Sequence, residues 1–423
     1  MTNLLNLLIG YGNEGKVFEE KEVYALAEKA FSALSLKDKR VLVLIPDHTR
    51  TCPVGLFFRI FFDLLGSSVK NLDYLLALGT HQPLSEEKIL ARVEITPGVR
   101  KGKYAKVNFY NHLWDKEETF KTVGIIPATR IKEITNGLFG EEVIIKVNKL
   151  IFQYDRVLIL GPTYPHEVVG FSGGNKYIFP GIAGREIINF FHWLGAIITN
   201  PVINGVKDTP VRKVIDEAAS FINVPILSFN LVVLGEKLRG LFIGEPKEAF
   251  SKAADLSARL HIIYKNEPFK KVLGITPLMY DDLWVAGKVM YKLEPIVADA
   301  GELIIYAPHI NEVSYTHGRI IDKIGYHVRD YYLKQWDRFR DIPGGVMAHS
   351  THVRGIGTFE NGVEKPRIKV TLATGIAEER CRKINLGYLN PSAINIKEWE
   401  GKEDKGILLV PRAGEILYRL KSG

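Results

Sequence analysis

The sequence predicts an α/β protein with two domains, and three observations support that fold class. The chain has 423 residues, whereas a single hydrophobic core rarely serves more than about 250–300 residues. Its hydrophobic fraction of 46% and charged fraction of 25% are ordinary for a globular protein. Short apolar runs alternate with helix-like patterns along the chain, which is typical of strands buried in mainly parallel sheets.

The first part of the chain contains four such runs, each ending at or next to Gly, Pro or Asp. Helix-like patterns over residues 21–34 and 54–67 follow the same alternation. Strand–helix alternation favours parallel strands joined by crossover helices, as in Rossmann-like sheets. The predicted strands are residues 41–47, 72–80, 156–162 and 224–234.

A second series of apolar runs begins near residue 270, and we place the domain boundary at "YKNEPF" near residue 265. The predicted domains are therefore residues 1–265 and 266–423. The ending "PRAGEILYRLKSG" predicts a strand, a turn and a short final helix that can return to the first domain. The predicted strands of the second series are residues 270–278, 301–309, 367–375 and 405–414.

Charge and composition exclude several classes of protein. The net charge of +8 is modest, and no dense Lys/Arg tract marks a nucleic-acid-binding arm. Only Cys52 and Cys381 are present, which excludes a disulfide framework and favours a reduced, cytoplasmic setting. The start "MTNLLNLLIGYG" does not have the pattern of a signal peptide, and no apolar run reaches the roughly 18 residues of a membrane span.

Ligands of open parallel sheets bind outside the carboxyl ends of the strands, which directs attention to three loops. The first is "PDHTRTCP", in which Asp47 and Arg50 follow a predicted strand. The Arg50 guanidinium suits a carboxylate or a phosphate, and Asp47 suits ribose hydroxyls. The alternative is a helix start with Asp47 or Thr49 as its N-cap.

The second loop, "GTHQP", exposes His81 between Gly79 and Pro83. A loop histidine of this kind is either a solvated side chain or an acid–base group. His112 in "FYNHLWD" ranks below it as a candidate because it lacks the neighbouring glycine.

The third loop ends in "SGGNK", where Lys176 follows Gly173 and Gly174. The spacing differs from that of an ATP-binding P-loop, and Tyr177 stands where that loop needs Ser or Thr. Lys176 is therefore either a lysine that forms a covalent Schiff-base or amide link, or an ordinary turn lysine.

His166 and His192 flank this lysine and are candidate metal ligands. They do not form a helical pair, and His192 lies in the helix-like "GREIINFFHWLGA", so a core histidine is the alternative there. Two polar segments, 308–319 and 347–355, lie in the second domain. They are expected to line a hydrophilic pocket, with metal binding by His349 and His352 as the alternative.

The ordered set "DHTR", "GTH", "PHEVVGFSGGNK" and "FFHW" resembles the nickel-dependent lactate racemase family, which includes related 2-hydroxy-acid racemases and epimerases. The resemblance covers most of the chain. His166, Lys176 and His192 match the family's spacing of a histidine, a cofactor-linked lysine and a nickel-binding histidine. The resemblance implies two α/β domains with an active-site cleft between them.

The resemblance also implies a cofactor, the nickel pincer nucleotide (pyridinium-3,5-bisthiocarboxylic acid mononucleotide nickel). It would be linked covalently to Lys176 after synthesis by separate maturation enzymes, and His192 would be the protein's nickel ligand. A square-planar site with sulfur donors suits Ni(II). The residues expected to bind the rest of the nucleotide are Asp47, Thr49, Ser172, Gly173 and Gly174.

By the same resemblance, a small-molecule 2-hydroxy acid gives a proton to a histidine and its α-hydride to the cofactor, and hydride return to the other face inverts the carbon. His81 and His166 match the family's pair of bases, and Arg50 and Lys288 match its carboxylate-binding residues.

One departure bears on the substrate. The family's lactate enzymes carry tyrosine and glutamine where this chain has Trp284 and Val285. Together with the polar segments of the second domain, this favours a polyhydroxylated acid such as gluconate, with Trp284 at the substrate and 2-epimerisation as the reaction.

Two other functions remain open from the residues alone. One is a zinc-dependent hydrolase that uses His81, His166 and His192. The other is a non-enzymatic anion- or nucleotide-binding protein, for which the pI of about 9.1 is the motivation.

Overall fold

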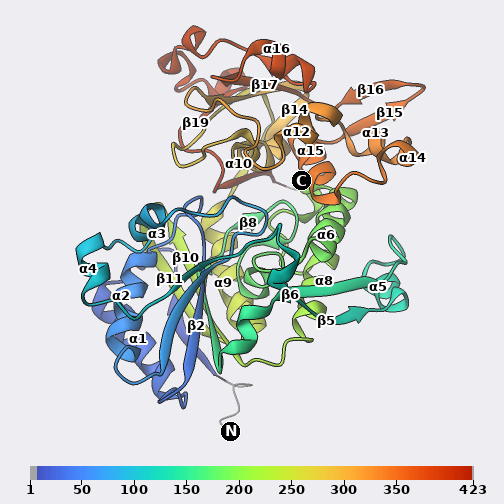
Figure 1. Ribbon diagram of the computed structural model, residues 1–423. Helices are drawn as coiled ribbons and strands as arrows, with labels where there is room; N and C mark the ends of the chain where they lie inside the picture. Colours follow the sequence, from blue (N-terminus) through green and yellow to red (C-terminus); the bar gives the residue numbers. More distant parts are fainter. Residues whose placement is uncertain (1–6, 422–423) are drawn as a thin grey trace. The chain divides into compact units, whose positions relative to one another are not determined.

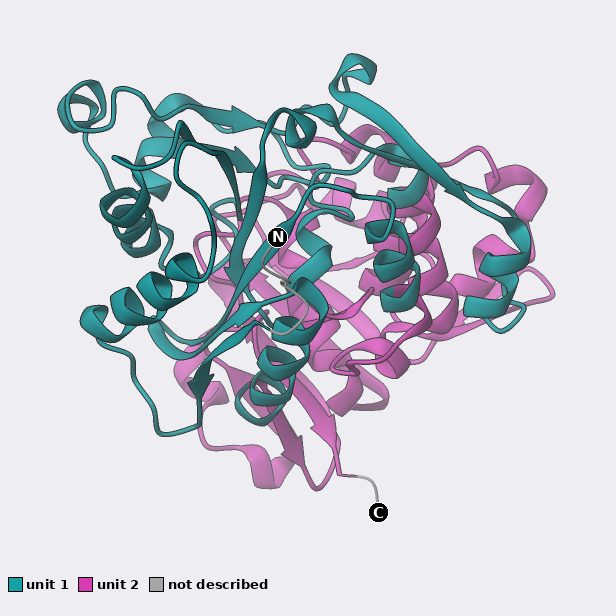
Figure 2. Ribbon diagram, turned by 90° about the horizontal axis from the view of Figure 1, so that it is seen from below, with its two compact units in different colours: residues 1–164, 172–188, 212–260 teal, residues 165–171, 189–211, 261–423 magenta. Residues whose placement is uncertain are grey.

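The computed structural model describes residues 7–421, which form two compact units. Of these residues, unit 1 comprises 7–164, 172–188 and 212–260, and unit 2 comprises 165–171, 189–211 and 261–421 (Figures 1 and 2).

Unit 1 is built on a seven-stranded sheet with the order β1-β11-β10-β7-β2-β3-β4. The strands from β10 to β4 are parallel to one another, and β1 and β11 complete one edge in antiparallel pairs. All four predicted strands are present, so the predicted α/β class is confirmed for this unit. The strands are β1 (Leu8–Gly12), β2 (Arg40–Ile45), β3 (Asn71–Leu76), β4 (Phe109–Asn111), β7 (Arg156–Pro162), β10 (Ile226–Leu234) and β11 (Lys237–Gly244).

Burial on both faces explains why these strands are almost continuously apolar. In β10, Leu231 and Val233 pack into the main core with α1 and α2, whereas Val232 between them packs with α9. The main core also contains Phe57 and Phe61, fully buried on α2. Each such side chain contributes roughly 1.5–3 kcal/mol by leaving water.

Helices and a separate two-stranded ribbon, in which β5 pairs with β6, complete unit 1. The helices are α1 (Glu20–Ser32), α2 (Val54–Leu65), α3 (Glu86–Arg92), α4 (Pro97–Lys101), α5 (Ala128–Ile134), α8 (Pro210–Ala219) and α9 (Pro246–His261), and the ribbon strands are β5 (Phe120–Ile126) and β6 (Val143–Asn148).

Unit 2 contains a five-stranded parallel sheet with the order β18-β17-β14-β13-β19. It includes all four strands predicted for the second series. The strands are β13 (Phe269–Ile275), β14 (Val297–Ala307), β17 (Lys369–Thr374), β18 (Gly387–Tyr388) and β19 (Ile407–Val410).

Smaller elements complete unit 2. Its ribbons pair β8 (Pro165–His166) with β9 (Gly170–Phe171) and β15 (Gly357–Glu360) with β16 (Val363–Pro366). The helices are α7 (Asn200–Ile203), α10 (Leu283–Ala286), α11 (Lys288–Leu293), α12 (Gly318–Ile324), α13 (Arg329–Leu333), α14 (Trp336–Phe339), α15 (Gly344–Arg354) and α16 (Glu378–Lys383).

The predicted final helix is wrong. Leu417–Leu420 form a strand, β20, which pairs in parallel with β12 (Ile262–Lys265) inside unit 2. Leu417 is fully buried opposite Ile262, so pairing with a distant segment outweighs the weak local helix preference of this short stretch. Residues 422 and 423 lie outside the described part of the chain.

The sequence-based division at residue 265 differs from the observed units, because two earlier segments belong to unit 2. The chain passes between the units inside α6 (Arg185–Ile198) and at the start of α8. As a result Lys176 lies in unit 1, whereas His166 and His192 lie in unit 2. No change in composition marks these crossings.

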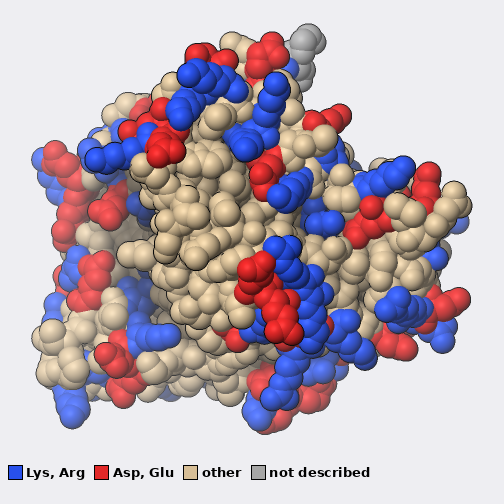
Figure 3. Space-filling view, turned by 90° about the horizontal axis from the view of Figure 1, so that it is seen from above, with Lys and Arg blue, Asp and Glu red and all other residues tan. Residues whose placement is uncertain are grey.

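Among residues 7–421, no helix combines the length and the hydropathy needed to cross a membrane. On the face shown in Figure 3, basic and acidic side chains lie beside one another.

Candidate active-site residues

Two of the predicted loops of unit 1 meet at the carboxyl ends of β2 and β3. His81 Nδ1 lies 2.5 Å from Asp47 Oδ2, although the two residues are 34 positions apart in the chain. Asp47 is buried and accepts two further hydrogen bonds from Thr49, from its backbone N at 3.0 Å and from its hydroxyl at 2.7 Å. The first two predicted loops therefore lie together at this edge of the unit 1 sheet.

The helix-cap alternative for Asp47 and Thr49 is wrong, since α2 begins at Val54 with Pro53 in the N-cap position. Burial by itself raises the pKa of Asp47. The charge and hydrogen bond of His81, the hydroxyl of Thr49 and the charge of Arg50 outweigh burial and hold that pKa well below its usual range. Asp47 is therefore a carboxylate at neutral pH.

This pairing decides which nitrogen of His81 is basic. A carboxylate only accepts hydrogen bonds, so the proton of neutral His81 resides on Nδ1 and points to Asp47. The lone pair then lies on Nε2. An aspartate that holds a histidine in this tautomer is a recurrent way to orient a general base.

Arg92 organises the same loop, and the sequence analysis missed it. Its guanidinium donates to three carbonyl oxygens of the loop after β2, those of Pro46 at 3.2 Å, Arg50 at 3.0 Å and Cys52 at 3.3 Å. Arg92 lies at the end of α3, 40 or more residues from these carbonyls, and no local motif marks it.

The glycines before Lys176 are required by backbone conformation and close packing. Gly173 has φ of +100°, and a Cβ built on it would lie 2.5 Å from the Thr163 hydroxyl oxygen. Gly174 also has a positive φ, and its N–H donates to the Asn230 side chain at 2.8 Å. The turn that follows, Gly174–Tyr177, leaves the Lys176 side chain partly exposed.

Ser172 and Arg212 stabilise this turn from either side. The Ser172 hydroxyl donates to Pro162 O and accepts from Tyr164 N, both at 2.9 Å, so it is engaged with the loop backbone. Arg212, which the sequence analysis missed, is buried, donates to Gly173 O and lies 3.9 Å from the Phe250 ring centroid. Burial lowers the pKa of Arg212 to about 10.

His112 has a structural role in unit 1. It is fully buried, its Nε2 donates to Ala183 O at 3.2 Å, and its Nδ1 accepts from the Asn148 amide at 3.2 Å. Burial lowers the pKa of His112 to about 4, so the ring is neutral.

In unit 2, His166 lies on the β8–β9 hairpin and is buried. The backbone N–H of Val168 donates to His166 Nδ1 at 3.2 Å. The proton of the neutral ring therefore resides on Nε2, the opposite arrangement to His81. Glu167 lies 3.4 Å from the same Nδ1 and would stabilise the ring if it became charged.

His192 is not a core histidine, so that alternative is wrong. Its neighbours Phe191 and Trp193 are buried, whereas the His192 side chain is partly exposed and stacks on Phe191 at 4.5 Å. A histidine accessible on a helix can act as a metal ligand.

Trp284 and Lys288 lie one helical turn apart, because Gly287 continues the right-handed helix from α10 into α11. Asp282 caps this segment by accepting from Val285 N at 2.9 Å. The Lys288 side chain is largely buried, and its Nζ lies 4.5 Å from the Tyr280 ring centroid. Trp284 and Lys288 therefore share one face of the helix.

The two polar segments of the second domain meet at Trp284. His349 stacks on the indole at 3.9 Å between ring centroids, and His317 lies against it at 4.5 Å. Both nitrogens of His349 are engaged, by the hydroxyls of Tyr291 at 2.7 Å and Tyr326 at 3.1 Å. Burial holds the pKa of His349 well below its usual range, and its two tyrosine partners leave no nitrogen for a metal.

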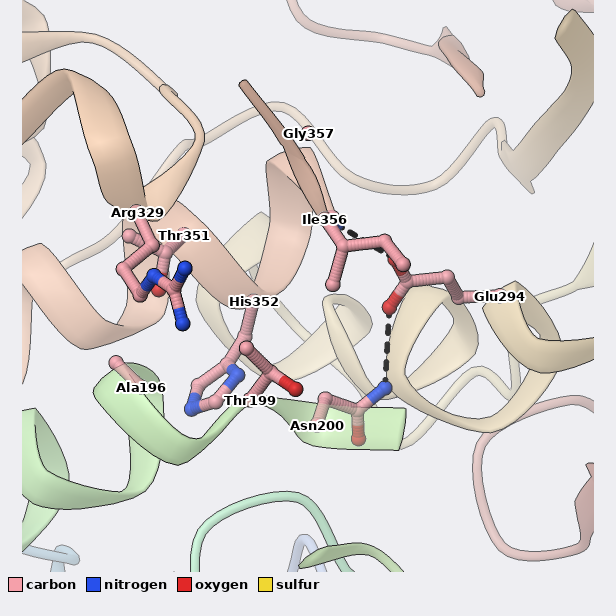
Figure 4. A pocket seen from close by; sticks show the side chains of 10 residues that line it. Ala196, Thr199, Asn200, Glu294, Arg329, Thr351, His352, Ile356 and Gly357 are labelled. Atoms are coloured by element: carbon pink, nitrogen blue, oxygen red, sulfur yellow. Dashed lines mark hydrogen bonds between the residues drawn. The ribbon is translucent and has the colours of Figure 1, made fainter. Parts of the chain in front are cut away.

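His352 borders a small cavity of about 40 Å³ inside unit 2, shown in Figure 4. Burial lowers the pKa of His352 to about 4, and its Nε2 is enclosed with no hydrogen-bond partner among the described residues. Across the cavity, the fully buried Glu294 accepts from Ile356 N at 2.7 Å and Asn200 Nδ2 at 3.2 Å. The cavity has room for about one to three water molecules between these groups.

Within either unit, the described residues contain no group of three His, Cys, Asp or Glu side chains arranged to bind a metal ion. His81 lies in unit 1, and His166 and His192 lie in unit 2. Neither unit by itself therefore supplies the three ligands that the zinc-hydrolase alternative requires.

Comparison with known proteins adds a family assignment to this geometry. Residues 19–203 match the family model described as the lactate racemase N-terminal domain. Lactate racemase from Thermoanaerobacterium thermosaccharolyticum is 24% identical over 289 residues, which is 67% of this chain and 63% of that protein. Lactate racemase from Lactiplantibacillus plantarum is 22% identical over 62% of this chain and 54% of that protein. The matches thus span less than two thirds of these relatives.

Two solved structures share the fold over nearly the whole chain. A protein from Thermotoga maritima is 35% identical, with a TM-score of 0.88, over 96% of this chain and 100% of that chain. The lactate racemase apoprotein from Thermoanaerobacterium thermosaccharolyticum is 19% identical, with a TM-score of 0.71, over 98% of this chain and 99% of that chain. The second likeness supports the α/β fold alone.

Proposed function

Since the chain belongs to the lactate racemase family, we propose that it is a racemase or epimerase that inverts the α-carbon of a 2-hydroxy acid. The observation that carries the proposal is the opposite tautomers of His81 and His166. His81 carries its lone pair on Nε2 because Asp47 holds the Nδ1 proton, and His166 carries a proton on Nε2 because Val168 N–H occupies Nδ1. One ring is set to accept a proton and the other to donate one.

Inversion needs such a pair. Formation of a planar 2-keto acid requires a base that takes the hydroxyl proton as the α-hydride leaves one face, and return of hydride to the other face requires an acid that gives a proton back to the oxygen. Asp47 stabilises His81 after it takes a proton, and Glu167 does the same for His166. Each histidine can thus serve in either direction.

The proposed cofactor is the nickel pincer nucleotide, and the residues of unit 1 fit a bound nucleotide. Lys176 is partly exposed after a glycine turn, and the buried hydroxyl of Thr163 beside that turn has no hydrogen-bond partner among the described residues. In this proposal Lys176 forms the covalent link, His192 binds nickel, and Asp47, Thr49, Ser172, Gly173 and Gly174 hold the nucleotide. When bound, the cofactor would supply the acceptor for the substrate's α-hydride.

We assign the substrate carboxylate to Arg50 and Lys288, because an anion needs cationic partners. For the remainder of the substrate, Trp284 and the polar segments that meet at its indole favour a polyhydroxylated acid such as gluconate over lactate. A cytoplasmic location and dependence on cofactor-maturation enzymes belong to the same proposal.

The first test is the intact mass of protein produced together with the maturation enzymes, beside a Lys176→Ala control. A covalent adduct present on the wild type and lost in the control supports the tether. If the wild type stays unmodified in a host that loads a known family member, the racemase mechanism is refuted, and a non-enzymatic binding function becomes the better explanation.

The second test compares rates of α-carbon inversion on gluconate and lactate by the loaded protein, with His81→Gln and His166→Gln as controls. Faster inversion of gluconate supports the epimerase assignment, and a preference for lactate refutes that assignment while leaving the racemase reaction in place.

A further inference from the structure

Unit 1 contains a polar hollow at the opposite ends of the strands from His81. It has a volume of about 430 Å³ and is lined by Ser35, Lys39, Tyr154, Asp155, Arg156, Asn223, Val224 and Pro225. These residues lie at the amino ends of β2, β7 and β10. Since β7 runs for seven residues, about 20 Å of strand separate the hollow from the loops at its carboxyl end. The hollow is therefore distinct from the candidate active-site loops of this unit.

Arg156 provides an uncompensated positive charge in this hollow. Its Nε and Nη1 are enclosed with no hydrogen-bond partner among the described residues, whereas Nη2 is neither enclosed nor bonded. Burial lowers the pKa of Arg156, and no carboxylate offsets that effect. Buried guanidinium groups are ordinarily paired with an acid, so an anion at Nη2 would supply what the surrounding protein does not.

The one carboxylate in the lining is already neutralised. Asp155 accepts from Arg40 at three points, from the backbone N at 2.8 Å, Nε at 3.2 Å and Nη2 at 2.9 Å. Lys39 is exposed and forms no ion pair among the described residues. With Asp155 and Arg40 cancelling, the hollow carries two net positive charges, from Lys39 and Arg156.

The remaining lining residues restrict the ligand. Ser35 and Asn223 are exposed neutral donors at the rim. The Tyr154 hydroxyl is engaged by Asp73 at 2.8 Å, and the lining presents no other aromatic side chain on which a base could stack. The volume lies within the usual range of small-molecule sites, about 300–1,000 Å³. A compact, polar dianion fits this set better than a nucleotide.

We propose that this hollow is a binding site for a small phosphorylated anion, held by Lys39 and Arg156 with Ser35 and Asn223 as neutral donors. The site is independent of the proposed racemase reaction, because it rests only on residues of the opposite sheet edge. It would give the protein a second ligand besides its substrate.

Isothermal titration of the full chain tests this, with inorganic phosphate and glycerol 3-phosphate as probes, citrate as a carboxylate probe, and ionic strength held constant with chloride. We expect saturable binding of both phosphates and at least tenfold weaker binding in Arg156→Gln and in Lys39→Gln. Lys37→Gln is the matched control, since Lys37 is exposed nearby but outside the lining.

Several results would overturn the proposal. The proposal fails if the wild type shows no saturable phosphate binding. It also fails if Lys37→Gln binds phosphate as weakly as the site variants, or if Arg156→Gln and Lys39→Gln both bind phosphate as tightly as the wild type. Binding of citrate without phosphate would overturn the ligand class. Lys39 is exposed, so its variant provides a readout even if Arg156→Gln fails to fold.

Discussion

Replacing Asp47 with asparagine should disable His81 as a base while leaving unit 1 folded. The new side-chain amide can still accept through its oxygen, but its NH₂ group cannot accept the Nδ1 proton of His81 where the carboxylate now does. If the NH₂ group faces the ring, the proton moves to Nε2 and the lone pair is lost from the reacting side. The variant also removes the negative charge that stabilises protonated His81.

General acid–base catalysis by one side chain contributes about 10²–10⁴ in rate. We therefore expect kcat of the loaded Asp47→Asn enzyme to fall by about 10²–10⁴, with a smaller change in KM. The carboxylate of Asp47 accepts three hydrogen bonds, from His81 and twice from Thr49. Each is worth roughly 1 kcal/mol net, so the free energy of unfolding should fall by about 1–3 kcal/mol.

The assay has an arm that needs no cofactor. Nitrogen-15 NMR of the histidine side chains in the unloaded protein reports which ring nitrogen of His81 carries the proton. The matched control is Asp73→Asn, since Asp73 is also buried in unit 1 and bonds Tyr154 and Asn108. Unchanged kcat together with an unchanged His81 tautomer in Asp47→Asn would refute the reasoning.

Three further predictions concern positioning and stability. Arg92→Lys should lower kcat/KM about tenfold, because one ammonium cannot reach three carbonyls of the loop after β2. Steady-state kinetics measures this, with Arg100→Lys as the control. Equal losses in both variants would contradict the prediction. His112 and His352 have pKa values of about 4 when folded and near 6.5 when unfolded. The unfolded state therefore binds protons first, and each histidine should cost about 3 kcal/mol of stability as pH falls from 6.5 to 4. Urea unfolding at pH 6.5 and pH 4 measures this loss of unfolding free energy. If His112→Gln loses as much stability between the two pH values as the wild type, the prediction is disproved for His112. Gly173→Ala should destabilise unit 1 more than Gly137→Ala. Both glycines have a positive φ, but only a Cβ at Gly173 would contact another atom, at 2.5 Å. Equal losses of stability in thermal unfolding would exclude the packing argument.

Local pattern was sufficient to predict most strands and the loops at their ends. The run 224–234 reads as a buried strand because β10 is covered on both faces, so most of its side chains are apolar. Asp47 and His81 come directly after the predicted strands, where the chain leaves the apolar run and polar side chains can serve a ligand. Because the carboxyl ends of parallel strands lie at one edge of a sheet, the two loops were expected at the same edge.

The β20 strand, the interleaved units and the partners of single side chains depend on contacts between distant segments. Leu417–Leu420 become a strand because Ile262–Lys265 lie beside them, and no feature of the short segment itself signals this pairing. The lone pair of His81 is placed by Asp47, and that of His166 by a backbone N–H. The sequence by itself determined which residues can act as acids, bases or ligands. The tertiary structure decided the proton position of each histidine, because the partner on the other ring nitrogen comes from the fold.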